Sequence, residues 1–209
     1  LKPEATETDL RAGADVVTQW RVGFYCVQPC WVRLAAGTLA GTPARVVSVI
    51  GFPHGCERTP VKAEAARIAV DEGAGELDMV LNVGALKSGA VARVAEDIAA
   101  VVAAGRGMPV KVILETGALT ADEKRLACRL VRDAGAAFVK TSTGFHPSGG
   151  ATVADVRLLR YQVPGFAELD LRHKELLYYL YEAALAGREI IYERSREQVK
   201  ADLARAAGF

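Results

Sequence analysis

The sequence predicts an α/β fold with a parallel sheet, of the (β/α)8 barrel type. Short apolar segments of strand length alternate with helical segments from about residue 22 to residue 140, which is typical of right-handed strand-helix-strand units. Residues 46–50 form a strand with almost no polar side chain, as expected for a parallel strand covered on both faces. Periodicity alone does not separate a barrel from an open doubly wound sheet. No G-x-G-x-x-G motif follows the first strand, and its absence favours the barrel.

Each element is expected from local sequence signals. Residues 6–9 offer N-cap candidates for the first helix, and the glycines of residues 73–75 are best explained as a helix C-cap. Strands are expected at 22–27, 46–50, 76–81, 110–114 and 138–140. Helices are expected at about 6–20, 32–39, 60–71, 91–104 and 120–134.

Composition limits the class of protein and of partner. The chain has 209 residues and a formal net charge of +1, which suits one globular domain and gives no electrostatic reason to expect nucleic acid or an acidic membrane as partner. We therefore expect a small-molecule or protein partner. The sequence has no apolar run of roughly 18 to 20 residues and no secretory signal, so a cytoplasmic location is expected. Four cysteines and three histidines without metal-ligand spacing make reduced thiols likelier than a zinc site.

One lysine stands out by its position. Phe138 and Val139 are expected to end a short buried strand, and Lys140 follows them directly before a loop rich in glycine and hydroxyl residues. The carboxyl end of such a strand is where barrel and open-sheet enzymes place their chemistry. Lys140 could be a charge that reaches out of the core, or a Schiff-base nucleophile, which requires a neutral amine and a desolvated or cationic environment.

Six segments of the chain together resemble the deoxyribose-phosphate aldolases. The resemblance covers residues 1–160 and implies a (β/α)8 barrel. It also implies a class I aldolase that reversibly cleaves 2-deoxy-D-ribose 5-phosphate to acetaldehyde and D-glyceraldehyde 3-phosphate, without metal or cofactor. The matching segments are L-K-P-E-A-T (1–6), F-Y-C-V-Q-P (24–29), V-I-G-F-P-H-G (49–55), G-E-L-D-M-V (75–80), V-K-V-I-L-E-T-G (110–117) and the Lys140 loop (138–150).

The resemblance also implies roles for single residues. Lys140 matches the Schiff-base lysine of the family and Asp78 its proton-relay aspartate, an arrangement that suits imine formation followed by proton transfer. By position alone, Asp78 could equally be a carboxylate that caps a loop. Lys111 matches a further lysine near the reactive one, and repulsion from its charge could favour the neutral form of Lys140.

Three more residues are candidates for the substrate-binding site. Cys26 matches a cysteine that lines the site in the family, although a buried thiol is more often part of the core. Thr141 and Thr143 could bond substrate hydroxyls, or they could satisfy the backbone of their own loop.

The end of the chain departs from the family. Residues 1–160 are expected to form the aldolase-type barrel portion and residues 161–209 a helical segment of uncertain origin, with a helix from 171 to about 192. The seventh and eighth strands of the family, with a second relay lysine and the phosphate-binding glycines, are not recognisable, and the first strand looks clipped. Lys174 lies in a helical pattern without those glycines, so we do not assign it the relay role.

These departures leave alternatives open. An incomplete barrel exposes sheet edges, so we expect a homo-oligomer. The substrate is expected to be a small phosphorylated sugar or aldehyde, and the aldolase activity could be weakened. The alternatives are a non-catalytic aldolase remnant that serves as an interaction or oligomerisation protein, and an aldolase for non-phosphorylated aldehydes.

Overall fold

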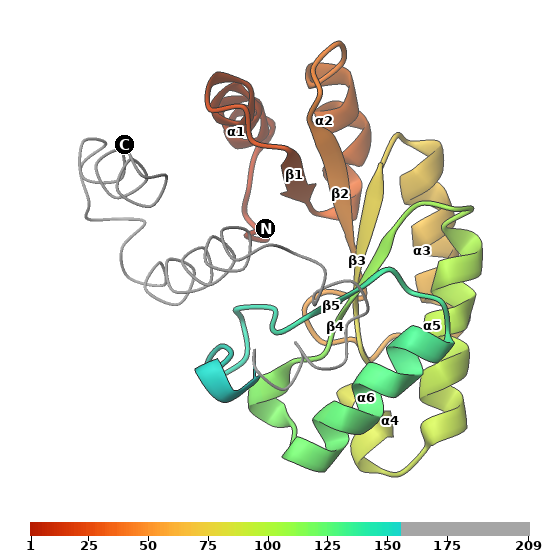
Figure 1. The fold of residues 1–209 in the computed structure, drawn as a ribbon. Helices are drawn as coiled ribbons and strands as arrows, with labels where there is room; N and C mark the ends of the chain where they lie inside the picture. Colours follow the sequence, from red (N-terminus) through yellow and green to blue (C-terminus); the bar gives the residue numbers. More distant parts are fainter. Residues whose placement is uncertain (156–209) are drawn as a thin grey trace, which may run out of the picture. The chain divides into compact units, whose positions relative to one another are not determined.

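The computed structural model describes residues 1–155, which form a parallel five-stranded sheet with helices between its strands (Figure 1). The strands lie side by side in chain order, β1-β2-β3-β4-β5. A doubly wound open sheet reverses its strand order at a switch point, so this order is the one expected of a barrel. The strands are β1 (Phe24–Val27), β2 (Arg45–Ile50), β3 (Glu76–Val80), β4 (Val110–Ile113) and β5 (Phe138–Lys140).

The helices begin and end close to the residues that the sequence predicts. Thr6 and Thr120 each form a capping box at the start of a helix, which satisfies backbone N–H groups that the first helical turn leaves free. The sequence did not predict α4 or the two short 3-10 helices. Among the described residues, no helix is both long and apolar enough to cross a membrane. The helices are α1 (Glu7–Gln19), η1 (Pro29–Trp31), α2 (Val32–Thr38), α3 (Thr59–Asp71), α4 (Val83–Lys87), α5 (Val91–Ala104), η2 (Thr116–Ala118) and α6 (Ala121–Asp133).

The two faces of the sheet differ in chemistry. Successive side chains of a strand point to opposite faces, and the outer face is apolar and packs against the helices. Leu77 and Met79 of β3 belong to one hydrophobic core with Ala66 of α3 and Ile98 of α5. Asp78, between the two apolar residues of β3, points to the inner face, where the charged side chains gather.

The sheet curls around this inner face. Lys111 of β4 has its Nζ atom 5.1 Å from the ring centroid of Phe24 on β1 and 5.7 Å from that of Phe138 on β5. β1 and β4 are three strand positions apart, and in a flat sheet this would separate them by about 14 Å. The first and last strands therefore turn toward a common interior, as in a barrel, and the predicted parallel α/β fold is confirmed.

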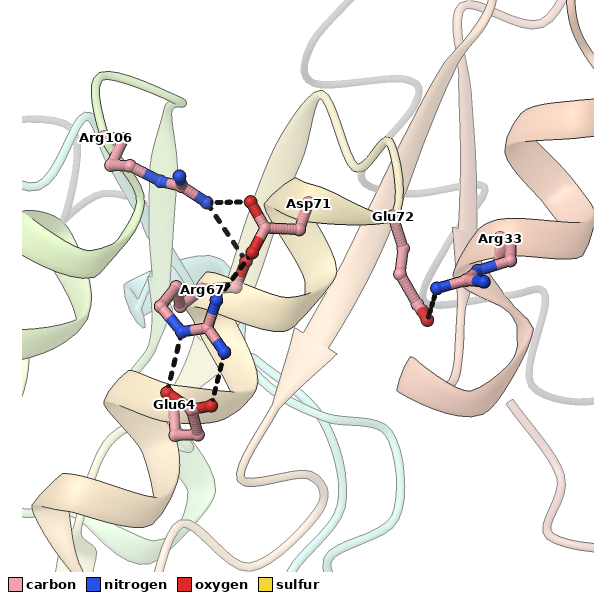
Figure 2. A network of polar contacts seen from close by, with 6 residues as sticks. All are labelled: Arg33, Glu64, Arg67, Asp71, Glu72 and Arg106. Atoms are coloured by element: carbon pink, nitrogen blue, oxygen red, sulfur yellow. Dashed lines mark hydrogen bonds and ion pairs between the residues drawn. The ribbon is translucent and has the colours of Figure 1, made fainter.

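The outside of the helical layer carries its own ion pairs (Figure 2). Arg67 of α3 pairs with Asp71 one turn later at 2.7 Å, and Asp71 also contacts Arg106, which follows α5. Arg33 of α2 pairs with Glu72 at 3.1 Å. Most of these side chains are about half exposed or more, so each pair adds little stability. The predicted boundary at residue 160 and the helix at 171–192 lie outside the described residues.

Candidate active site

The candidate catalytic residues meet on the inner face of the sheet, with Asp78 in the middle of β3, Lys111 near the start of β4 and Lys140 at the carboxyl end of β5. Asp78 of β3 lies beside Lys111 of β4, and Lys140 lies beside Ile113, two residues further along β4. Lys140 Nζ donates a hydrogen bond to Asp78 Oδ2 at 2.6 Å, and Lys111 Nζ lies 3.5 Å from Asp78 Oδ1. The structure thus brings together three residues that are far apart in the sequence.

Asp78 and Lys140 differ in how far solvent reaches them. The Asp78 side chain is only 4% exposed, whereas that of Lys140 is 38% exposed. A small aldehyde can therefore reach the lysine amine, while the carboxylate stays fixed behind it. Within residues 1–155, Asp78 does not cap a loop, because its carboxylate pairs with the amines of Lys140 and Lys111.

Lys111 is more deeply placed than Lys140 and contacts a second carboxylate, that of Glu76. Burial lowers the pKa of Lys111, and repulsion from Lys140 acts in the same direction. Glu76 is 3% exposed and was not among the residues predicted for the site. Strand alternation could have identified Glu76, because it stands two positions before Asp78 on the same strand and its side chain therefore points to the same face of the sheet.

Cys26 lies on β1 within the electrostatic reach of Asp78, Lys140 and Lys111. Burial raises the pKa of the Cys26 thiol to about 11, and the negative charge of Asp78 adds to the shift. The thiol is therefore protonated at neutral pH and is not a thiolate nucleophile. Among the described residues, no group of three or more His, Cys, Asp or Glu side chains is placed to hold a metal ion.

The two threonines lie in the loop after Lys140. The Thr143 hydroxyl donates to the carboxylate of Glu115 and accepts from the Phe145 backbone N–H at 3.1 Å. The Thr141 carbonyl accepts from the Thr116 backbone N–H at 2.9 Å. In this structure Thr143 satisfies its own loop, and direct bonding of either hydroxyl to a substrate stays a prediction.

Taken together, the site has the groups needed for imine chemistry on an aldehyde. It offers an accessible primary amine, a buried carboxylate in hydrogen-bond contact with that amine, and a second cation close to both. A carboxylate so placed can exchange protons with a reacting group directly or through one water.

Comparison with known proteins points to one family. No family model matches the chain. The chain is 50% identical over 164 residues to the deoxyribose-phosphate aldolase of Enterococcus faecalis, covering 78% of this chain and 74% of the relative. It is 48% identical over 164 residues to deoxyribose-phosphate aldolase 1 of Bacillus licheniformis, covering 78% of this chain and 73% of the relative.

Solved structures agree with these relatives. A structure described as QR15, an aldolase, matches with a TM-score of 0.74 and 36% identity, over 79% of this chain and 73% of its own. The deoxyribose phosphate aldolase of Aeropyrum pernix, described as a tetramer, matches with a TM-score of 0.71 and 29% identity, over 79% of this chain and 69% of its own.

Proposed function

The chain belongs to the deoxyribose-phosphate aldolase family, and on this basis we propose that it is a class I aldolase. The proposed reaction is the reversible cleavage of 2-deoxy-D-ribose 5-phosphate to acetaldehyde and D-glyceraldehyde 3-phosphate. The observation that carries the proposal is the 2.6 Å contact between Lys140 Nζ and Asp78 Oδ2 on the inner face of the sheet. The lysine supplies the nucleophile for Schiff-base catalysis, and the buried carboxylate can take up and return the protons that move during the reaction.

Lys140 acts as the nucleophile in the proposed reaction. Its amine, after losing a proton, attacks the aldehyde carbon of the open-chain sugar, and loss of water gives a protonated imine. This cation draws electrons from the C2–C3 bond of the sugar, which breaks as the hydroxyl on C3 loses its proton. D-Glyceraldehyde 3-phosphate then leaves, and an enamine remains on Lys140.

Asp78 moves protons in the proposed reaction. The carboxylate, directly or through a water, accepts the hydroxyl proton during bond cleavage and returns a proton to the enamine carbon. Water then hydrolyses the imine and releases acetaldehyde, which regenerates the Lys140 amine. Burial of Asp78 keeps the carboxylate in one position, so little reorganisation is needed during each transfer.

Lys111 and Cys26 complete the surroundings of the reacting atoms. Lys111 supplies a positive charge near Lys140, which favours loss of the Lys140 proton before attack. Cys26, as a neutral thiol, forms part of the wall of the site. Thr141 and Thr143 remain the proposed hydrogen-bonding residues for substrate hydroxyls.

Borohydride trapping tests this proposal. The full chain is incubated with acetaldehyde or 2-deoxyribose 5-phosphate, reduced, and analysed by intact mass and peptide mapping. We expect one reduced adduct, on Lys140, and none in Lys140→Met. Lys87→Met is a matched control, because Lys87 is an exposed lysine paired with Glu123 outside the site, and this variant should label like the wild type.

The outcomes separate the alternatives that the sequence leaves open. An adduct formed with acetaldehyde but no turnover of the phosphorylated sugar would support an aldolase for non-phosphorylated aldehydes. A folded protein that forms no adduct on Lys140 would contradict the enzyme and support a non-catalytic remnant.

We also propose that the chain works as a homo-oligomer. The Aeropyrum pernix relative is described as a tetramer, and within residues 1–155 the edge strands β1 and β5 each pair with one neighbouring strand. Light scattering coupled to gel filtration measures the mass, and a monomer at micromolar concentration would contradict the proposal.

A further inference from the structure

Glu115 lies two residues after β4, next to the loop that follows Lys140, and it has two unusual properties. Its backbone is left-handed, with φ 57° and ψ 60°, a region that residues other than glycine seldom adopt. Its side chain is buried, with only 3% of the residue exposed. The roles proposed above for other residues explain neither the left-handed backbone nor the burial of Glu115.

The Glu115 carboxylate is bonded to the Lys140 loop. The Thr143 backbone N–H donates to Glu115 Oε2 at 3.2 Å, and the Thr143 hydroxyl donates to the same oxygen. That hydroxyl in turn accepts from the Phe145 N–H at 3.1 Å. One carboxylate therefore orders the chain from Thr143 to Phe145 through a continuous series of hydrogen bonds.

The backbone on both sides of Glu115 is bonded to the same segment. The Leu114 N–H donates to the Lys140 carbonyl and the Thr116 N–H donates to the Thr141 carbonyl, each at 2.9 Å. The left-handed turn at Glu115 sits between these two bonds. The Lys140 main chain and the loop after it are thus held by one short segment, residues 114–116.

Packing alone does not hold this loop. Glu115 and Thr143 both line a cavity of about 210 Å³, so part of their surroundings is open space and not side-chain contact. Within residues 1–155, the hydrogen-bond donors to the Glu115 carboxylate come from the uncharged Thr143. A left-handed backbone and a buried carboxylate that, within residues 1–155, has no ion pair to a lysine or arginine both cost stability, and such costs cluster at functional sites.

We propose that Glu115 is a positioning residue for catalysis. Through Thr143 it fixes the Lys140 loop, and so sets the direction from which the Lys140 amine approaches an aldehyde. Glu115 does not itself touch the reacting atoms. This inference rests on the proposed aldolase function and adds a residue to its machinery.

Two variants separate the hydrogen bonds from the backbone conformation. Glu115→Gly removes the carboxylate but relaxes the left-handed backbone, because glycine adopts positive φ without penalty. Glu115→Gln must still adopt the left-handed backbone, and its side-chain carbonyl oxygen can accept hydrogen bonds from both Thr143 donors. Arg21→Gly is a matched control, because Arg21 is also left-handed (φ 52°) but is exposed and precedes β1.

The kinetic readout is turnover of 2-deoxyribose 5-phosphate by the full chain. We expect Glu115→Gly to remain folded and to lose about 10- to 100-fold in kcat with KM changed less than threefold, because small misplacements of a catalytic group cost about that much. Glu115→Gln should stay within about threefold of the wild type, and Arg21→Gly should be unchanged. Wild-type kcat in Glu115→Gly, or equal losses in the Gly and Gln variants, would overturn the proposal.

Hydrogen exchange gives a readout that does not depend on activity. Amides of residues 141–147 should exchange faster in Glu115→Gly than in the wild type, and at the wild-type rate in Glu115→Gln. Unchanged exchange in Glu115→Gly would overturn the positioning role even in an active enzyme. A wild type that forms no imine would instead refute the proposed function, and the exchange result would still decide whether Glu115 orders the loop.

Discussion

A buried ion pair between two helices should dominate the response of this fold to mutation. Lys62 of α3 donates to Asp97 Oδ2 of α5 at 2.5 Å and to the Val80 carbonyl at the end of β3 at 3.1 Å. The two side chains are 0% and 4% exposed. Lys62→Met leaves the Asp97 carboxylate buried without its partner, and Asp97→Leu does the same to the ammonium. Each change should lower the free energy of unfolding by about 3–5 kcal/mol.

The double variant Lys62→Met/Asp97→Leu should behave differently from the sum of its parts. Replacing both members of a buried pair by apolar side chains is often neutral or stabilising, and the lost bond to Val80 costs about 1 kcal/mol. We therefore expect the double variant to lie within about 2 kcal/mol of the wild type. The two single changes would sum to about 6–10 kcal/mol if they were independent.

Urea unfolding followed by circular dichroism measures these differences. With a slope of about 2 kcal/mol per molar urea, a loss of about 4 kcal/mol moves the midpoint down by about 2 M. Single variants that lose less than about 1 kcal/mol would refute the reasoning, as would a double variant as unstable as the sum. Lys87→Met, which breaks an exposed pair, is the control and should cost less than about 1 kcal/mol.

Three further predictions concern the site and one helix. Alkylation of Cys26 by iodoacetamide should accelerate about tenfold per pH unit up to its pKa of about 11, because only the thiolate reacts. Peptide mass spectrometry measures the alkylation rate of each cysteine. Equal rates at pH 7 for Cys26 and the exposed Cys30 would contradict this prediction. Lys111→Met should move the pH profile of imine trapping on Lys140 to higher pH, because a nearby cation is lost; an unchanged profile would remove Lys111 from the proposed role. Thr120→Ala removes the side-chain acceptor of the α6 capping box and should cost about 1 kcal/mol in urea unfolding, whereas Thr120→Ser should cost less.

The elements of the fold could be predicted from the sequence because their signals are local. The apolar run at 46–50 predicts β2, and the helix expected at about 120–134 begins within one residue of the start of α6. α4 was missed, because five residues are too short to show a helical period. The sheet order and the curl that brings Phe24 and Phe138 to one Lys111 depend on contacts between distant segments, which no local pattern contains.

Some residues of the site could likewise be identified from the sequence, whereas others depend on contacts between distant segments. Lys140 could be singled out because a charge at the end of an apolar strand is unusual, and Asp78 and Lys111 followed from the resemblance. Glu76 could have been found from strand alternation. Glu115 could not, since its importance depends on a left-handed backbone and on a bond to Thr143, 28 positions away.

The charges on the inner face suit two opposite needs of the proposed reaction. Glu76 and Asp78 supply two carboxylates, and Lys111 and Lys140 supply two amines, so the group is neutral when Lys140 carries a positive charge. That is the case in the resting ion pair and again in the protonated imine, whose nitrogen would stay beside Asp78. The neutral amine needed for attack leaves an excess negative charge, and the repulsion between the two lysines is what favours its formation. The same four residues therefore combine a repulsion between two amines with two carboxylates that stabilise the cationic intermediate through which carbon-carbon cleavage proceeds.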